Sequence, residues 1–103
     1  MQRLDREPLP EFAGADNLPA IQTSDNTCDL RGLRVDDAWP MLETFLDRAM
    51  HGGQRVAFVV HGHGSGALRE KVREELKRSR YVSRFRSGQQ SEGGEGVTVV
   101  WLS

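Results

Sequence analysis

The 103-residue sequence has a single cysteine, Cys28, and therefore cannot form a disulfide within the chain. It has no apolar run approaching the ~20 residues of a membrane-spanning helix, and its N-terminus lacks the basic-then-apolar order of a signal peptide. A reducing compartment suits a chain without disulfides, so we expect a cytoplasmic protein with no membrane partner. A zinc site would have to be assembled almost entirely from His51, His61 and His63 with carboxylates.

The chain also lacks an excess of charge of either sign. Its 14 basic and 15 acidic side chains give a net charge of −1, which excludes a uniformly basic protein that coats nucleic acid through bulk charge. The distribution is uneven, because residues 69–86 contain eight basic and three acidic side chains, a local excess of +5, whereas residues 1–27 are acidic. An anionic partner is therefore expected to bind near residues 69–86.

Residues 1–26 contain three of the four prolines and show no hydrophobic period of 2 or 3.6, so we interpret them as a flexible linker or arm. Phe12, Leu18 and Ile21 could dock this arm on a domain, but its composition favours a mobile tail. Regular patterning begins at residue 27, which predicts one domain over residues 27–103.

The pattern over residues 27–103 predicts the element order β-α-β-α-β-β. Extended segments are expected at 27–30, 55–60, 81–86 and 97–102, and the apolar run at 55–60 is typical of a central strand covered on both sides. Two helices, before Gly52 and over 65–79, have apolar residues at three- and four-residue spacing. The first contains Pro40, which it tolerates only if it begins near Asp36 or Asp37.

This order predicts a two-layer α/β sandwich with a mixed four-stranded sheet and two helices. The strand order stays open, since the last two strands could pair as a hairpin or lie apart.

A glycine-rich turn, His61-Gly62-His63-Gly64-Ser65-Gly66, joins the strand at 55–60 to the second helix. Its glycines let the backbone turn sharply, and the helix start offers unpaired N–H groups and the positive end of a dipole to a phosphate-sized anion. The turn lacks the Lys-Ser/Thr of a P-loop and the G-x-G-x-x-G order of a dinucleotide fold. Basic residues beyond it could contact the phosphates of a polymer. The predicted contacts are Arg69, Arg73, Lys77, Arg78, Arg84 and Arg86, together with residues 62–66.

The predicted strands at 27–30 and 55–60 both end in chemically active residues. If they are parallel, their carboxyl ends share one edge of the sheet, which would bring Asp29, Arg31 and His61 together. A carboxylate, a guanidinium and an imidazole around a phosphate-binding turn can orient a nucleophile, neutralise phosphodiester charge and move protons. Structural interpretations stay open, with Asp29 as a turn cap and His61 bonded to a backbone carbonyl. His63 is expected to touch substrate, and His51 to interact with a helix dipole.

Three motifs make residues 26–102 resemble the small MutS-related (Smr) domain family. Cys28-Asp29-Leu30-Arg31-Gly32 is similar to its L-D-L-[HR]-G motif, residues 61–66 to its H-G-x-G-x-G motif, and residues 92–100 to its glycine-rich strand entry. Cys28 replaces the family's usual leucine, and we expect little consequence because it has apolar character.

The resemblance implies an α/β sandwich like the C-terminal domain of a bacterial translation initiation factor, with largely sequence-independent nucleic-acid binding and endonuclease activity. It implies nicking of DNA, or RNA cleavage in members tied to stalled ribosomes. By the same resemblance Asp29 and Arg31 form the catalytic motif, and His61 with the glycines the substrate-holding turn. Arg31 in place of His is typical of domains fused to the C-terminus of MutS-like ATPases. A parent protein of DNA repair, recombination control or ribosome rescue is therefore implied, with the ribosome as a further candidate partner.

The leading hypothesis is an endonuclease domain for DNA or RNA, with Asp29, Arg31 and His61 at the reacting phosphate. Two mechanisms fit: Mg²⁺ or Mn²⁺ held by Asp29 activates water, or His61 and Asp29 perform metal-free acid–base chemistry with the ribose 2′-hydroxyl of RNA. A lone carboxylate binds metal weakly, so no tightly bound cofactor is expected. The alternatives are a non-catalytic DNA-, RNA- or ribosome-binding module and a mononucleotide-binding domain, for which no base-recognition feature is present.

Overall fold

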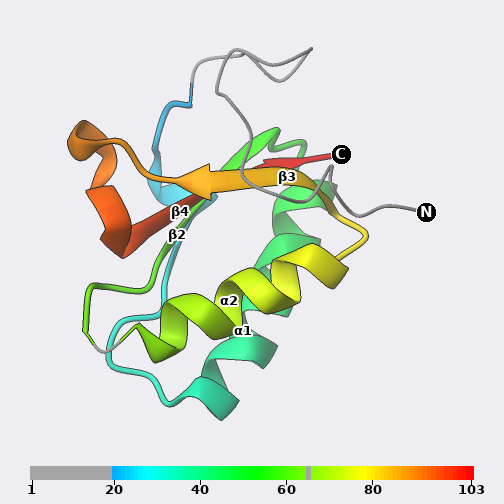
Figure 1. Ribbon diagram of the computed structural model, residues 1–103. Coiled ribbons are helices and arrows are strands. Elements are labelled where there is room, and N and C mark those ends of the chain that lie inside the picture. Colours follow the sequence, from blue (N-terminus) through cyan, green and yellow to red (C-terminus); the bar gives the residue numbers. More distant parts are fainter. Residues whose placement is uncertain (1–19, 65) are drawn as a thin grey trace.

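The computed structural model describes residues 20–64 and 66–103, which form one sheet with two helices packed on one of its faces (Figure 1). The strands are β1 (Thr27–Asp29), β2 (Val56–Val60), β3 (Val82–Ser87) and β4 (Val97–Leu102). They lie in the order β1-β2-β4-β3, with β1 parallel to β2 and β4 antiparallel to both β2 and β3. The predicted two-layer α/β sandwich with a mixed four-stranded sheet is confirmed, and its last two strands pair as a hairpin.

Stripes of apolar side chains attach both helices to the sheet. Helix α1 (Val35–His51) buries Ala38, Leu42, Leu46 and Ala49, and helix α2 (Ala67–Arg78) buries Val72 and Leu76. The sheet meets them with residues that alternate along β2 and β4, whereas in β3 a register irregularity places the two inward residues three positions apart. These core residues are Cys28, Ala57, Val59, Val82, Phe85, Val100 and Leu102. Within the described part of the chain, neither helix is long and apolar enough to cross a membrane.

The start of α1 differs from the prediction. The helix begins at Val35 instead of near Asp36 or Asp37, because the Arg34 carbonyl accepts the N–H groups of both Asp37 and Ala38, each at 2.9 Å. Pro40 therefore lies inside the helix, two positions beyond Ala38, whose N–H is the first to have an acceptor four residues back. It leaves the Asp36 carbonyl without a helical donor, and this is tolerated because both residues lie on the exposed side of α1.

The face of the sheet away from the helices has a second, smaller core. It buries Val56, Phe58, Val97, Val99 and Trp101, and Ala20 packs against it. The guanidinium carbons of Arg84 and Arg86 lie 4.4 Å and 5.2 Å from the centre of a Trp101 ring. Strand β2 is thus buried on both faces as predicted, although the helices cover only one of them.

Residues 20–26 of the predicted arm lie against the sheet. The buried Asn26 amide donates to the Ile21 carbonyl over 2.8 Å and accepts the Thr23 N–H over 2.8 Å, within a 3-10 turn over Ser24–Asn26. Ile21 itself is 67% exposed. Residues 1–19, which include Phe12 and Leu18, lie outside the described residues.

Candidate functional site

The carboxyl ends of β1 and β2 meet at one edge of the sheet, as their parallel pairing requires. Asp29 is the register partner of Val60, and the Leu30 N–H donates to the Val60 carbonyl over 2.7 Å. The segment Asp29–Arg31 therefore lies directly beside the 61–66 turn, where parallel strands of α/β proteins commonly bind ligands.

Asp29 and Arg31 form a two-pronged ion pair. Nε of Arg31 lies 2.9 Å from Oδ1 of Asp29, Nη2 lies 2.7 Å from Oδ2, and the Arg31 N–H donates to Oδ1 over 3.0 Å. The side-chain hydrogen bonds from Arg31 are the main cause that lowers the pKa of Asp29 to about 2. Because the two side chains are 49% and 64% exposed, an ionised carboxylate holds an accessible guanidinium in one orientation.

The aliphatic part of Arg31 rests on Gly62. Gly62 has φ of +81°, and a Cβ atom there would lie 3.2 Å from Cγ of Arg31. Glycine thus provides both the left-handed backbone and the space for the arginine stem. The Asp29–Arg31 pair is in this way fitted against the glycine-rich turn.

His61 points to the opposite face of the sheet from Asp29. Successive strand residues alternate between faces, so Asp29 shares the face of its partner Val60, whereas His61 follows Val59 toward the helices. The predicted group of Asp29, Arg31 and His61 is therefore not assembled. The structure joins Asp29 to Arg31 and places His61 on the other side.

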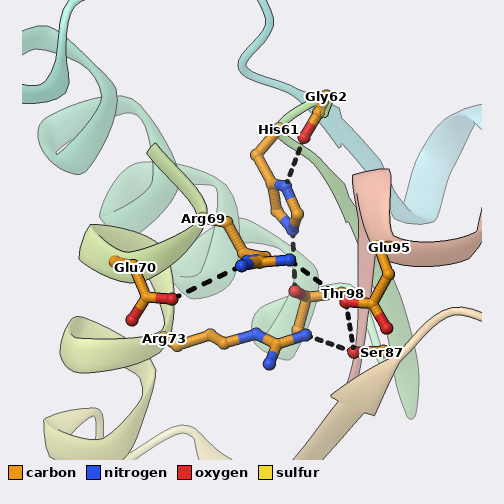
Figure 2. Close-up of polar contacts among 8 residues, drawn as sticks. All are labelled: His61, Gly62, Arg69, Glu70, Arg73, Ser87, Glu95 and Thr98. Carbon is orange, nitrogen blue, oxygen red and sulfur yellow. Dashed lines mark hydrogen bonds and ion pairs between the residues drawn. The ribbon is translucent and has the colours of Figure 1, made fainter. Parts of the chain in front are cut away.

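The His61 ring is buried, with both nitrogens engaged (Figure 2). Nδ1 lies 3.1 Å from the Gly62 carbonyl oxygen and Nε2 lies 2.8 Å from Oγ1 of Thr98. Because a carbonyl only accepts, Nδ1 carries the proton, and Nε2 of the neutral ring accepts the Thr98 hydroxyl. Burial lowers the pKa of His61 most; the Gly62 hydrogen bond opposes this, and Arg73 and Arg69 lower it further. The neutral form of the His61 ring is therefore favoured, and its two hydrogen bonds stabilise the conformation of the turn.

Gly96, the residue that precedes β4, stabilises the conformation of the turn. The Gly96 carbonyl accepts the N–H groups of His61 and Gly62 at 3.0 Å and 2.9 Å. A Cβ at Gly96 would lie 2.8 Å from Cε1 of His63, so the exposed His63 ring rests on this glycine. The rest of the turn leads into α2 through Gly66, whose φ of +87° makes it a left-handed N-cap.

A hollow of about 190 Å³ lies at the turn and the start of α2. Its lining comprises His61, Gly62, His63, Gly64, Gly66, Leu68 and Arg69. The predicted binding residues of the turn are thus brought together, except that Ser65 lies outside the described residues. A larger hollow of about 600 Å³ lies between β1 and α1 and reaches Asp29, Met41 and Arg48.

Two of the predicted phosphate contacts, Arg69 and Arg73, lie beneath the turn in a polar cluster (Figure 2). Arg69 Nη1 donates to Oε1 of Glu95 over 3.2 Å, and Arg73 Nη2 donates to Oγ of Ser87. The Ser87 hydroxyl in turn donates to Glu95 over 3.3 Å. These arginines therefore already contact protein groups.

The other predicted basic contacts are divided between two faces of the molecule. Lys77 and Arg78 are exposed on the last turn of α2, where Arg78 approaches Glu74 at 3.8 Å. Arg84 is 2% exposed and lies against Trp101, and Arg86 is held by both oxygens of Glu92 at 2.8 Å and 3.2 Å. Arg84 and Arg86 thus help to cover the second core, on the face of the sheet away from the helices. They do not extend the basic surface of α2.

Four residues near the turn were not predicted as site residues from the sequence: Ser87, Glu95, Gly96 and Thr98. Glu95, Gly96 and Thr98 come near the turn because β4 runs antiparallel beside β2. Ser87 joins them because β3 pairs with β4, with Ser87 opposite Thr98. The one available signal was the place of Glu95, Gly96 and Thr98 in the third motif, residues 92–100, whereas nothing in the sequence marked Ser87.

The metal-ligating capacity of the site is small. Over residues 20–64 and 66–103, no group of three or more His, Cys, Asp or Glu side chains is arranged to hold a metal ion. Burial, together with the Asp29 charge, raises the pKa of the Cys28 thiol to about 11, so the thiol stays protonated in the core. Asp29 is thus the single predicted ligand at the sheet edge.

The family model of the Smr domain matches residues 28–103. The chain is 47% identical over 74 residues to Endonuclease MutS2 of Anaeromyxobacter sp. strain Fw109-5, covering 72% of this chain and 9% of that protein. It is 51% identical over 74 residues to Endonuclease MutS2 of Fusobacterium nucleatum, covering 72% and 10%. The chain thus spans about a tenth of the length of these relatives.

Two solved structures are similar over most of the chain. The crystal structure of the Smr domain of Thermus thermophilus MutS2 has a TM-score of 0.74 and 41% identity, covering 76% of this chain and 98% of that one. The stand-alone small MutS-related protein YdaL of Escherichia coli has a TM-score of 0.74 at 22% identity, covering 78% and 66%, and supports the fold alone.

Proposed function

Because the chain belongs to the Smr domain family, we propose that it is a nucleic-acid-binding endonuclease domain that cleaves phosphodiester bonds with little sequence specificity. Relatives named Endonuclease MutS2 support this assignment. We further propose that the domain is part of a MutS-like protein that acts in DNA repair, recombination control or ribosome rescue.

The observation that carries the proposal is the exposed Asp29–Arg31 pair resting on Gly62. Arg31 presents a guanidinium, fixed by three hydrogen bonds from its side chain and backbone to Asp29, next to a hollow that opens at a helix N-terminus. A phosphodiester held by the turn would bring its non-bridging oxygens to both groups. Negative charge that grows on the phosphorus oxygens during attack is then stabilised by Arg31.

Asp29 acts in this proposal chiefly as an orienting group. With a pKa of about 2 it is a weak base at neutral pH, since efficient proton transfer needs a pKa near the working pH. Arg31 leaves one acceptor site of Asp29 open, on Oδ2, which can accept a hydrogen bond from an attacking water molecule or a ribose 2′-hydroxyl. His61 serves as a positioning residue that fixes the turn from the helix side.

A resident divalent ion does not suit the donor set. Mg²⁺ and Mn²⁺ are usually bound by one or two carboxylates whose oxygens are free to ligate, whereas Arg31 occupies all but one of the acceptor sites of Asp29. The proposed chemistry therefore relies on the chain's own groups.

The direct test is cleavage of supercoiled plasmid DNA and of structured RNA by the purified chain. Each substrate is incubated with Mg²⁺, with Mn²⁺ and with EDTA, and the product ends are analysed. A 2′,3′-cyclic phosphate demands attack by the ribose 2′-hydroxyl, whereas 5′-phosphate or 5′-hydroxyl ends on DNA demand water. If both polymers stay intact under all conditions, the endonuclease assignment is wrong.

A second function, a non-catalytic nucleic-acid- or ribosome-binding module, has one observation in its favour. Asp29 is too weakly basic and His61 too buried to be an obvious general base. Under this alternative the Asp29–Arg31 pair only binds phosphate, and the chain retains nucleic acid without cutting it.

A further inference from the structure

The Glu95 carboxylate lies where donors from α2 and β3 converge (Figure 2). Its Oε1 accepts from Arg69 Nη1 over 3.2 Å and from the Ser87 hydroxyl over 3.3 Å. The Ser87 oxygen in turn accepts from Nη2 of Arg73, so the second guanidinium orients the hydroxyl toward Glu95. Oε1 of Glu95 therefore accepts two hydrogen bonds, and the positively charged guanidinium groups of Arg69 and Arg73 lie close to it.

Glu95 is held loosely compared with its neighbour in the same loop. Its side chain is 63% exposed, its hydrogen bonds are long, and it lies between Gly94 and Gly96. Glu92, by contrast, is 14% exposed and accepts from Arg86 at 2.8 Å and 3.2 Å and from the Gln89 N–H at 2.7 Å. The loop is thus anchored through Glu92, while Glu95 can leave its partners at small cost.

The cluster around Glu95 has more donors and more positive charge than acceptors. Among residues 20–64 and 66–103, the carboxylates of Glu95 at 3.2 Å and of the exposed Glu70 at 3.6 Å approach Arg69, and none forms an ion pair with Arg73. The Nε atoms of both arginines are buried, and neither has a hydrogen-bond partner among the residues that the structure describes. A group with several acceptor oxygens suits this environment better than one carboxylate oxygen.

The cluster is continuous with the candidate phosphate site. Arg69 contacts Glu95 with one end of its guanidinium and also lines the hollow at the 61–66 turn. Nη2 of Arg69 lies close to Gly66, 3.7 Å from where a Cβ of that residue would be. An anion bound at the turn and an anion bound in place of Glu95 would therefore both contact Arg69.

We propose that Arg69, Arg73 and Ser87 form a second phosphate-binding subsite, which Glu95 occupies until a phosphate group of a nucleic-acid strand replaces it. This inference rests on the proposed function, since the turn would hold the adjacent phosphate. A phosphate oxygen accepts the Arg69 and Ser87 donors that Oε1 of Glu95 gives up, and the carboxylate moves into solvent. The phosphate can belong to a strand terminus or to an internal diester.

Neutral variants of Glu95 test this exchange. Fluorescence anisotropy compares the unmodified chain with Glu95→Gln and Glu95→Ala on oligonucleotides that carry either a 5′-phosphate or only hydroxyl ends. Glu43→Gln is the matched control, because it removes one negative charge from the exposed face of α1. Both Glu95 variants are expected to lower Kd by about two- to fivefold, the range of an exposed ion pair, and Glu43→Gln to leave it unchanged.

The two oligonucleotides distinguish the phosphate sources. A gain limited to the 5′-phosphorylated strand assigns the subsite to a terminal phosphate, and an equal gain on both assigns it to an internal diester. The gain is further expected to disappear when Glu95→Gln is made in an Arg69→Gln chain, because the freed donor is then missing. An equal gain from Glu43→Gln, or no gain from either Glu95 variant, overturns the proposal.

Inorganic phosphate separates this inference from the proposed function. If the unmodified chain binds no nucleic acid, the proposed function fails, and the subsite is tested by titrating Glu95→Gln with phosphate and following the Nε–H NMR signals of Arg69 and Arg73. Phosphate-dependent shifts of these two signals, larger than those of Arg78, support the subsite. Absence of such shifts contradicts it.

Discussion

The hydroxyl of Thr98 donates to Nε2 of His61 across 2.8 Å, which ties the end of β2 to the central strand β4 beneath the glycine-rich turn. The Gly96 carbonyl reinforces this link by accepting two N–H groups from the turn. The exposed turn and the Asp29–Arg31 pair are therefore positioned by a strand at the far end of the sequence. Changes in β4 should alter the site without touching a ligand.

Thr98→Val should destabilise the domain. Valine has nearly the same shape but offers no donor, so Nε2 of His61 is left buried without its partner, at a cost of about 1–3 kcal/mol. Urea unfolding followed by circular dichroism measures this loss. Thr44→Val, on the exposed side of α1, is the control and should change the unfolding free energy by less than about 0.5 kcal/mol.

Stability should fall as the pH is lowered from about 7.5 to about 5.5. The pKa of His61 is lowered in the folded chain, chiefly by burial, whereas the unfolded chain takes up a proton near pH 6.5. The unfolded state therefore binds more protons in this range, and the free energy of unfolding decreases toward acid by at most about 1.4 kcal/mol per pH unit. Asp29, with a pKa of about 2, stays ionised throughout.

A histidine variant identifies the group responsible for this slope. His61→Asn should flatten it, because asparagine takes up no proton in this range. A slope that persists in His61→Asn would assign the pH dependence to another group.

Gly62→Ala should cost more stability than Gly53→Ala. Both glycines have φ of +81°, but a Cβ meets nothing within 4 Å at Gly53, whereas at Gly62 it lies 3.2 Å from Cγ of Arg31. The left-handed backbone alone costs about 1–2 kcal/mol for alanine, so the excess at Gly62 measures the Arg31 contact. Thermal unfolding of the two variants gives this difference, and equal losses would mean that Arg31 moves aside freely.

The sequence predicted the elements and the edge of the sheet well but not the faces on which side chains lie. The parallel pairing of β1 and β2 brought Asp29 and Arg31 to the turn as expected. His61 was expected beside them, yet strand alternation directs it to the other face. Arg84 and Arg86 illustrate the same limit, because only the pairing of β3 with β4 reveals Trp101 beneath them.

Arg86 and Arg78 should therefore respond differently to truncation. Arg86→Ala leaves the half-buried Glu92 without its partner and should cost about 2–3 kcal/mol of unfolding free energy. Arg78→Ala, whose side chain is 69% exposed, should leave stability nearly unchanged but weaken nucleic-acid binding and reduce its salt dependence by about one phosphate contact. Unfolding curves and binding at two salt concentrations separate the two effects.

Paired measurements of cleavage and binding by Asp29→Asn test the central claim most directly. Asparagine keeps the size of the side chain but removes the charge that fixes Arg31, and because the pair is exposed the domain should still fold. We predict that the rate of phosphodiester cleavage falls by at least about a hundredfold. Affinity for the same uncleaved strand should change less than about threefold, as should both quantities in the exposed control Glu43→Gln. Cleavage at the original rate by Asp29→Asn, with binding retained, would contradict the assignment of the Asp29–Arg31 pair to the reacting phosphate.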